Sequence, residues 1–249
     1  MKQRWQKKPS IPKPEWKDGY RDIVMYAVNT GKRFRFFIFK EDGTIDPEAL
    51  KKIETIMADK DNGAEHKVDE RLVKLLYKLI LFFNATQINV ISGYREPANN
   101  EESHSHHADG TAIDFMIPGV KLPAVAKTAR RLGHVGVGYY PVSGFVHLDV
   151  RDSHSYFWAD PSGPGKRNCT REIMKGAGYN FDKKWTPATD EPIKKIQKTK
   201  PEKIKKPLQK NIKKTKTKTN QKIKKKSTLD SPDKSDDKNP DTAQKNSKK

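Results

Sequence analysis

The chain of 249 residues contains a single cysteine, Cys169, and no long apolar run. One cysteine cannot form an intrachain disulfide, so the fold cannot depend on a disulfide. The cysteine content therefore does not indicate whether the protein works in an oxidising or a reducing compartment. No stretch of about 18 apolar residues is present that would predict a membrane-spanning helix. The basic start MKQRWQKKPSIPKPEWK is not followed by the apolar stretch of roughly 7 to 15 residues that a signal peptide needs. We therefore expect a protein that remains inside the cell, begins further upstream, or is exported by another route.

Aromatic residues are lacking after residue 193, and acidic residues are scarce between residues 194 and 226. Residues 194–226 hold sixteen lysines and one acid, Glu202, a net charge of +15, whereas residues 227–249 hold five lysines and five aspartates and are neutral. Of the total charge of +20, only +5 therefore belongs to residues 1–193. So little apolar content cannot offset the entropy of ordering, and residues 187–249 are predicted to be a disordered, lysine-rich tail. Such a tail either solubilises the protein or binds a polyanion, such as nucleic acid, anionic lipid or an anionic wall polymer.

A single folded domain is predicted between this tail and a basic, proline-containing leader at residues 1–18. Its bounds are residues 19–186. The segment YRDIVMYAVNTGKRFRFFIF (20–39) is rich in aromatic and β-branched residues around an Asn-Thr-Gly turn, which predicts two strands. A helix is expected to begin at Asp46, because an N-cap aspartate followed by proline is a strong start signal. The leucines of DERLVKLLYKLILFF recur at helical spacing and predict a core helix with no role beyond packing.

The second half of the predicted domain is richer in strands. QINVIS and TAIDFMIPGV have strand character, LPAVAKTARRL fits a short helix closed by a glycine, and VGVGYYPVSGFVHLDVR reads as a β-hairpin with strands near 135–140 and 145–150. No internal repeat is present. The order of elements predicts one α+β domain with a mostly antiparallel sheet and one inserted helix.

Two segments carry polar groups suited to a metal. EESHSHHADGTAIDF offers the candidate ligands His104, His106, His107 and Asp114. A catalytic zinc ion needs three protein ligands and keeps a fourth position for water. From spacing alone these residues form either part of such a site or a mobile, histidine-rich surface loop.

The second segment, FVHLDVR, places His147 and Asp149 on one face of a strand because side chains alternate with a period of two. Polar groups on a buried strand need partners. The alternatives here are a metal site shared with the first segment and a hydrogen-bonded core histidine.

SHHADGTAID has the pattern Ser-x-His-x-x-Gly-x-Ala-x-Asp and resembles the signature of the D-alanyl-D-alanine carboxypeptidase and murein endopeptidase superfamily of zinc peptidases. VISGYREP resembles the Ser-Gly-Tyr-Arg turn of that family, the hairpin resembles its last hairpin, and YFWAD follows where a tryptophan is usual. NTGKRFRFFIFKEDGTIDPEAL and the leucine-rich helix look like its bacterial cell-wall branch. The resemblance covers about residues 20–165. It implies the hedgehog/DD-peptidase-like fold, an antiparallel sheet with flanking helices and zinc in a cleft on the sheet.

The resemblance also implies which residues bind the ion. It assigns Zn²⁺ to His107, Asp114 and His147. By the same register His104 and His106 are not ligands and flank the mouth of the cleft.

Further roles follow for residues around the ligands. Arg95 is expected to bind a carbonyl or carboxylate of the substrate, a task suited to its forked donors, unless it is simply a surface arginine. Ser105 is expected to hydrogen-bond substrate. Several relatives carry an acid three residues before the last ligand, where this chain has Gly144. Asp149 is therefore the candidate general base, or else it orients His147 from behind.

These residues predict a zinc metallopeptidase, endopeptidase or carboxypeptidase, that hydrolyses peptide cross-links or stem peptides of peptidoglycan. The family places such an enzyme in the periplasm or cell envelope. The alternative is a non-catalytic, zinc-bearing module that binds wall or another polyanion, with affinity from the tail. Nucleic-acid binding ranks last, because the tail lacks aromatic residues that stack on bases and residues 1–193 carry a net charge of only +5.

Overall fold

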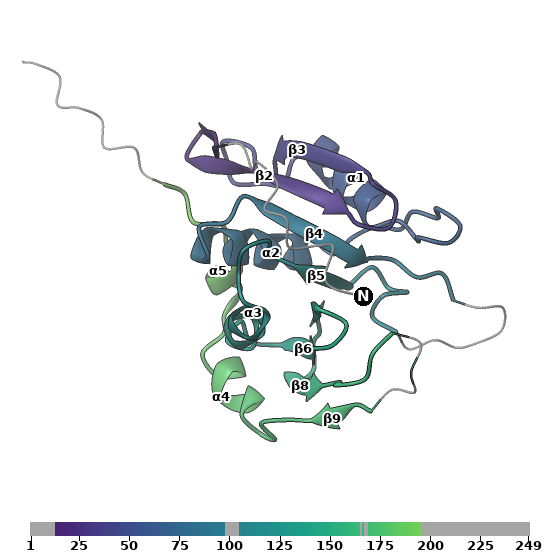
Figure 1. The fold of residues 1–249 in the computed structure, drawn as a ribbon. Helices are drawn as coiled ribbons and strands as arrows, with labels where there is room; N and C mark the ends of the chain where they lie inside the picture. The colour runs from purple at the N-terminus through teal and green to yellow at the C-terminus, as the bar shows by residue number, and fades with distance from the viewer. Residues whose placement is uncertain (1–12, 98–104, 165, 167–168, 196–249) are drawn as a thin grey trace, which may run out of the picture. The chain divides into compact units, whose positions relative to one another are not determined.

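A computed structural model describes residues 13–97, 105–164, 166 and 169–195. Its centre is a mixed sheet in which the strands follow the order β1-β2-β4-β5-β7-β6-β8-β9, with β3 also paired to β2. Figure 1 shows these strands descending from β3 at the top to β9 at the bottom, with α2, α3 and α5 gathered on the left. The strands are β1 (Trp16–Lys17), β2 (Tyr20–Ala27), β3 (Arg33–Phe37), β4 (Gln87–Ser92), β5 (Ala112–Met116), β6 (Val135–Tyr140), β7 (Phe145–Val150), β8 (Tyr156–Ala159) and β9 (Arg171–Glu172).

Two helices begin at aspartate caps, and the first of these, at Asp46, was predicted. The Asp46 carboxylate accepts a hydrogen bond from the backbone N–H of Glu48 at the start of α1, and Asp69 caps α2 through two backbone N–H groups. A side-chain acceptor at this position satisfies an N–H that the helix itself leaves unpaired. The helices are α1 (Pro47–Ile56), α2 (Glu70–Phe82), α3 (Leu122–Ala129), α4 (Gly178–Asp182) and α5 (Pro187–Asp190).

The predicted α+β class with flanking helices is confirmed, but the sheet is mixed and not antiparallel throughout. β2 runs parallel to β4, and β6 runs parallel to β8. Parallel neighbours need a long crossover. The first is supplied by the segment that holds β3, α1 and α2, and the second by β7, which returns on the other side of β6.

The hydrophobic core lies between one face of the sheet and the helices. The predicted core leucines of α2 (Leu72, Leu75, Leu76 and Leu79) are buried. They pack in one cluster with alternate residues of the central strands, among them Ile113, Phe115 and Leu148. Complete burial of one such side chain stabilises the fold by roughly 1.5–3 kcal/mol. Because side chains alternate along a strand, the strand residues next to these three in the sequence point to the opposite face of the sheet.

The described contacts reach beyond the predicted bounds of 19–186. β1 pairs with β2, and after α5 the backbone N–H of Lys195 donates to the carbonyl of Gly19 at 2.8 Å. α5 is held because Asp190 is buried against Arg71 of α2. Most of the predicted leader and tail, residues 1–12 and 196–249, lies outside the described residues and stays a prediction. No helix of the described residues is long and apolar enough to cross a membrane.

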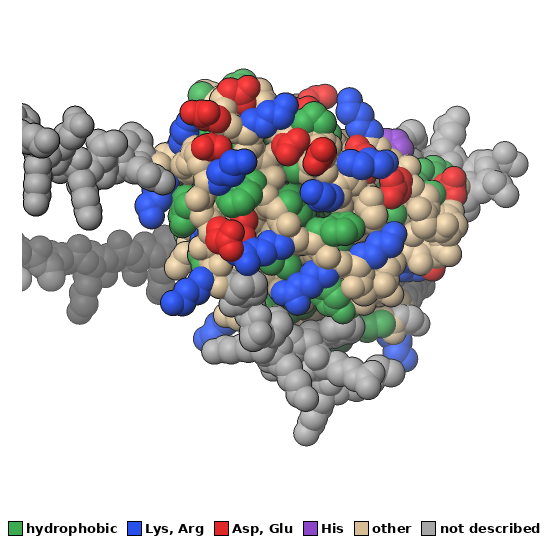
Figure 2. Space-filling view, turned by 90° about the horizontal axis from the view of Figure 1, so that it is seen from above, with side chains coloured by type: hydrophobic (Ala, Val, Ile, Leu, Met, Phe, Trp, Pro, Cys, Tyr) green, Lys and Arg blue, Asp and Glu red, His purple; other side chains and the backbone are tan. Residues whose placement is uncertain are grey.

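The surface of the folded part carries both signs of charge. In Figure 2, seen from above the view of Figure 1, lysine and arginine side chains alternate with aspartate and glutamate side chains over this face. This agrees with the small net charge of residues 1–193.

Candidate metal centre

A row of cross-strand partners crosses the sheet on the face opposite the core. Ser92 of β4 pairs with Asp114 of β5, Asp114 with His147 of β7, His147 with Gly138 of β6, and Gly138 with Trp158 of β8. Cross-strand partners point to the same face with their Cβ atoms about 4.5–5.5 Å apart. The register of five strands therefore assembles this row from residues far apart in the sequence.

Three side chains converge at the centre of this row. His147 Nδ1 lies 2.8 Å from Asp114 Oδ1, and His107 Nε2 lies 3.1 Å from His147 Nδ1 and 3.4 Å from Asp114 Oδ1. All three residues are buried, and one ligand atom from each lies within 4.8 Å of the others. Two imidazoles and one carboxylate are the donor set of a catalytic zinc site with one open position. The residues that the family resemblance singled out thus meet in space, and their chemistry fits the ion.

His107 reaches the cluster from a turn and not from a strand. Its Nδ1 lies 2.6 Å from the carbonyl oxygen of Gly93, so Nδ1–H donates there and the lone pair of Nε2 faces the cluster. The hydroxyl of Ser105 accepts from the backbone N–H of His107 at 3.3 Å and supports the same turn. Gly110 closes the turn at φ +68°, and a side chain there would collide with the carbonyl of Lys67. The turn therefore aims one chosen ring nitrogen at the cluster.

Asp149 lies behind His147, on the side of the ring away from the cluster. Its Oδ2 is 3.1 Å from His147 Nε2, Arg151 donates to both of its oxygens at 2.7 Å, and the N–H of Gly136 donates to Oδ1 at 3.1 Å. A side chain at Gly136 would collide with this carboxylate. Asp149 is thus buried, with both oxygens occupied. Of its two roles expected from the sequence, this geometry favours orientation of His147 over that of a general base.

Among the described residues, the neighbouring His106 is not part of the cluster. His106 Nε2 lies 3.7 Å from Asp149 Oδ1, and its Nδ1 lies 3.2 Å from Thr111 Oγ1, at the edge of the site. His104 lies outside the described residues.

The charges of the cluster shift one another's pKa. Burial by itself would raise the pKa of Asp114, but hydrogen bonds with His107 and His147 hold it well below its usual value. Burial would likewise raise the pKa of Asp149, which His147 and Arg151 instead lower. For His147, burial opposes the charged form, yet the two carboxylates outweigh it and raise the pKa to about 9. Without a metal the cluster therefore carries a proton that an incoming cation would displace.

Arg95 lies at one end of the row. Its guanidinium contacts Asp114 Oδ2, and its Nε donates to Ser92 Oγ at 2.9 Å. Half of its side-chain surface is exposed. Arg95 therefore keeps donors available to a ligand beside the cluster.

The opposite end of the row contains residues that were not singled out as site residues from the sequence. The ring of Trp158 lies 5.1 Å from that of His147, and its Nε1–H donates to the hydroxyl of Tyr140 at 3.0 Å. The sequence held two signals for this end of the row. One is the tryptophan of YFWAD, which stands where the family usually has one, and the other is the alternation in VGVGYY, which places glycine instead of a side chain at Gly136 and Gly138 on the site face of β6. Arg151 pairs with Asp149, and Ser92 accepts from Arg95. Nothing in the sequence indicated that these two residues belong to the site.

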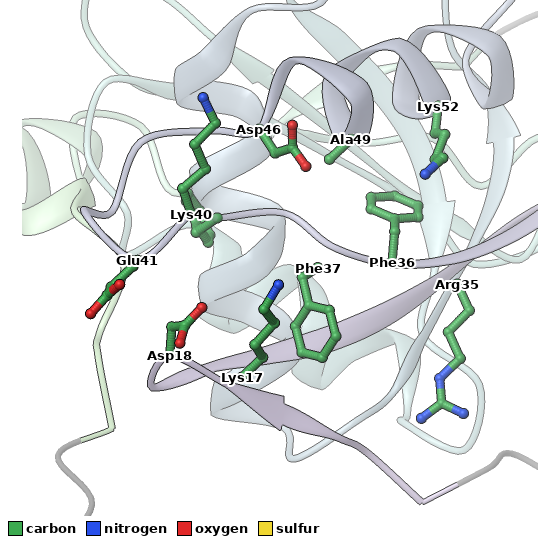
Figure 3. A pocket seen from close by; sticks show the side chains of 11 residues that line it. Lys17, Asp18, Arg35, Phe36, Phe37, Lys40, Glu41, Asp46, Ala49 and Lys52 are labelled. Atoms are coloured by element: carbon green, nitrogen blue, oxygen red, sulfur yellow. The ribbon is translucent and has the colours of Figure 1, made fainter.

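Two hollows in the structure lie away from this cluster. The first, of about 370 Å³, is shown in Figure 3 beside α1 and β3, and includes the side chains of Lys17, Phe37 and Lys52. Its Arg35 is already paired with Asp22 and Glu15. The second, of about 420 Å³, lies near the loop between β3 and α1 and the end of α5. Neither contains a residue of the cluster, and neither has a comparable set of converging ligand atoms.

Comparison with known proteins gives consistent matches. Residues 16–156 match the family model described as peptidoglycan L,D-endopeptidase MepK. The probable peptidoglycan L,D-endopeptidase MepK of Haemophilus influenzae is 36% identical over 152 residues, which cover 57% of this chain and 78% of that protein. The peptidoglycan L,D-endopeptidase MepK of Escherichia coli K12 is 32% identical over 151 residues, 57% of this chain and 79% of that protein. No solved structure matches the chain.

Proposed function

The chain belongs to the peptidoglycan L,D-endopeptidase MepK family of metallopeptidases, and we propose that it is a zinc-dependent enzyme that cleaves peptide bonds in peptidoglycan. The observation that carries this proposal is the convergence of two imidazole nitrogens and one carboxylate oxygen in a buried cluster. Catalytic zinc sites use three such ligands.

His107 would present Nε2, His147 would present Nδ1, and Asp114 would present a carboxylate oxygen to the ion. When bound, zinc lowers the pKa of water toward neutrality and polarises the carbonyl of the scissile bond. The protein residues behind the ligands hold their geometry. Asp149 accepts from His147 and is itself clamped by Arg151, an arrangement that orients a ligand histidine and strengthens it as a base toward metal.

Substrate binding is assigned to the rim of the cluster. Arg95 has exposed donors next to Asp114 and would bind a carboxylate or carbonyl of the stem peptide. The hydroxyl of Ser105 accepts from the backbone of His107, which leaves its own O–H free to donate to substrate. The two curated relatives are named L,D-endopeptidases, so we infer cleavage between an L- and a D-residue within a cross-linked peptide, in the cell envelope.

The test is digestion of purified wall sacculi by the zinc-loaded protein, with the released muropeptides identified by mass spectrometry. We expect fragments with a new amino terminus at a D-residue, and loss of all release with EDTA. His107→Ala should be inactive, whereas the matched control His106→Ala, one residue away and outside the cluster, should retain most activity. Release that survives both chelation and His107→Ala would contradict the proposal.

Two observations support the second candidate, a module that binds wall without cutting it. Gly144 stands where several relatives carry an acid, and Asp149 lies behind the ring of His147. Binding without cleavage predicts that the full chain sediments with sacculi in EDTA, that this binding falls steeply with salt because the tail supplies it, and that no fragment is released. Any zinc-dependent release of fragments excludes a purely non-catalytic role.

A further inference from the structure

The strand β6 is shaped to leave space on the site face of the sheet. Its valines, Val135 and Val137, face the core, whereas Gly136 and Gly138 alternate with them toward the metal cluster. A Cβ at Gly138 would lie only 2.6–2.7 Å from three atoms of the Trp158 ring. The missing side chain is therefore what lets Trp158 lie flat over β6, beside His147.

The position of Trp158 fixes the position of Tyr140. The indole Nε1 stands over Gly138, which is the cross-strand partner of His147, and it donates to the Tyr140 hydroxyl at 3.0 Å. Tyr140 lies on the same face as Gly138, and its ring stacks on Phe145 with the centroids 4.3 Å apart. Tyr140 thus bends back along β6 so that its ring lies against Phe145 and its hydroxyl lies beside Trp158 Nε1, on the face of the sheet that carries the cluster.

The hydrogen bond from Trp158 also sets what the hydroxyl can do. An indole N–H is only a donor, so the tyrosine oxygen accepts from it and its own hydrogen remains free to donate elsewhere. In the described residues, no acceptor takes this hydrogen. A half-buried donor held by two contacts and directed at a cluster edge is pre-organised, and a pre-organised donor loses little free energy to reorientation when charge develops in front of it.

We propose that the Tyr140 hydroxyl donates a hydrogen bond to the oxygen of the scissile carbonyl as negative charge develops on it, with Trp158 as the residue that positions this hydroxyl. This role rests on the proposed peptidase function. It places substrate between Arg95 on the β4 side of the metal row and Tyr140 on the β6 side.

Two features support Tyr140 over its neighbours. Burial raises the pKa of Tyr140, with Asp114 adding to the effect, and this outweighs the opposing hydrogen bond from Trp158, so the phenol stays protonated at neutral pH and remains a donor. Tyr139 belongs to the other face of β6 and packs against the core, and His106 contacts Asp149 instead.

The experiment compares Tyr140→Phe with Tyr139→Phe in the zinc-loaded full chain, with a soluble cross-linked muropeptide as substrate. Loss of one pre-organised oxyanion donor lowers kcat by about 10²–10³-fold. We expect this loss in Tyr140→Phe, with KM within about 3-fold and the zinc content unchanged, since only the charged oxygen of the transition state needs the donor. Tyr139→Phe should differ little from wild type. A phosphinate analogue of the cleaved peptide should bind Tyr140→Phe more weakly by a similar factor.

Trp158→Phe keeps an aromatic ring over Gly138 but removes the N–H. We expect a smaller fall in kcat, on the order of 10-fold, because the Tyr140 ring still stacks on Phe145 but its hydroxyl loses the hydrogen bond from Trp158.

Several outcomes would overturn this role. They are a kcat for Tyr140→Phe within about 3-fold of wild type, a change in KM alone, or an equal loss in Tyr139→Phe. If wild type is active and His107→Ala is inactive, such an outcome removes Tyr140 and leaves the peptidase function intact. A zinc-loaded wild type that releases no fragment overturns both.

Discussion

Two of the networks of charged groups in the described residues, one at α5 and one at the metal cluster, differ in what their polar atoms face. In the network at α5, Arg71 donates to Asp190 at 2.7 Å and to the carbonyls of His134 and Gly133 at 2.8 and 2.7 Å, with its guanidinium over the Trp185 ring. Each of these donors meets an acceptor. The donors of Arg71 are thus paired and tie α5 to α2, although in the described residues the second oxygen of Asp190, Oδ1, is buried without a hydrogen-bond partner.

The metal cluster is arranged in the opposite way. His107 Nε2, His147 Nδ1 and Asp114 Oδ1 all point their lone pairs toward one place, and the Arg151–Asp149 pair supports them from behind. Three acceptors held together in a buried site repel one another unless a proton or cation joins them. Burial of charge is therefore common to both networks, and the convergence of acceptors is what distinguishes a candidate binding site from a structural clamp.

The difference between the two networks is tested most strongly by removing one carboxylate from each. Asp114→Ala removes a metal ligand, and we expect activity on sacculi to fall by more than about 10³-fold, because the metal would lose one of its three protein ligands. Its thermal unfolding in EDTA should stay cooperative. Zinc per chain measured by mass spectrometry and fragment release together check this prediction. A variant that keeps stoichiometric zinc and wild-type release would show that Asp114 is not a ligand.

Asp190→Ala should have the opposite outcome. It leaves the partly buried Arg71 without its carboxylate, and breaking a buried pair in this way costs about 3 kcal/mol. Urea unfolding should show the lower stability, while zinc content and activity at low temperature stay near those of wild type. Equal stability of the variant and wild type would mean that the α5 clamp does not hold the chain.

The substitution Asp149→Asn distinguishes the two candidate roles of Asp149, orientation of His147 and general base. If it orients His147, zinc affinity should fall by about 10–100-fold, as for other carboxylates behind a metal-bound histidine. If it is the general base, zinc affinity should be unchanged and activity lost even at saturating zinc. Competition with a chromophoric chelator measures the affinity, and Asp152→Asn, a nearby exposed aspartate, is the control.

The smallest expected effect is the pH dependence of the metal-free domain. The pKa of His147 is raised to about 9 in the fold, so its protonated form contributes stability that is fully present below its unfolded pKa, about 6.5, and is lost as pH rises through 9. The metal-free melting temperature should therefore fall between pH 6.5 and 9. Zinc affinity should rise over the same range, because fewer protons compete for the ligand. Melting curves in EDTA and in zinc check both signs. A metal-free melting temperature that rises with pH would contradict the proton-bridged cluster.

Much of the fold was predictable from local patterns. The N-cap at Asp46, the leucine spacing of α2 and the turn between β6 and β7 depend on residues within a few positions of one another, and each lies where it was expected. The α5 clamp was not predicted, because Asp190 is paired with Arg71, which lies 119 residues away in the sequence.

The candidate site divides in the same way. The family resemblance singled out His107, Asp114 and His147, whereas spacing alone left His104, His106 and His107 as equal candidates. Only the tertiary structure decided that Asp149 lies behind His147 and that Tyr140 lies beside it. These placements follow from strand register and from the space left by Gly136 and Gly138, and register is set by packing between distant segments and not by local sequence.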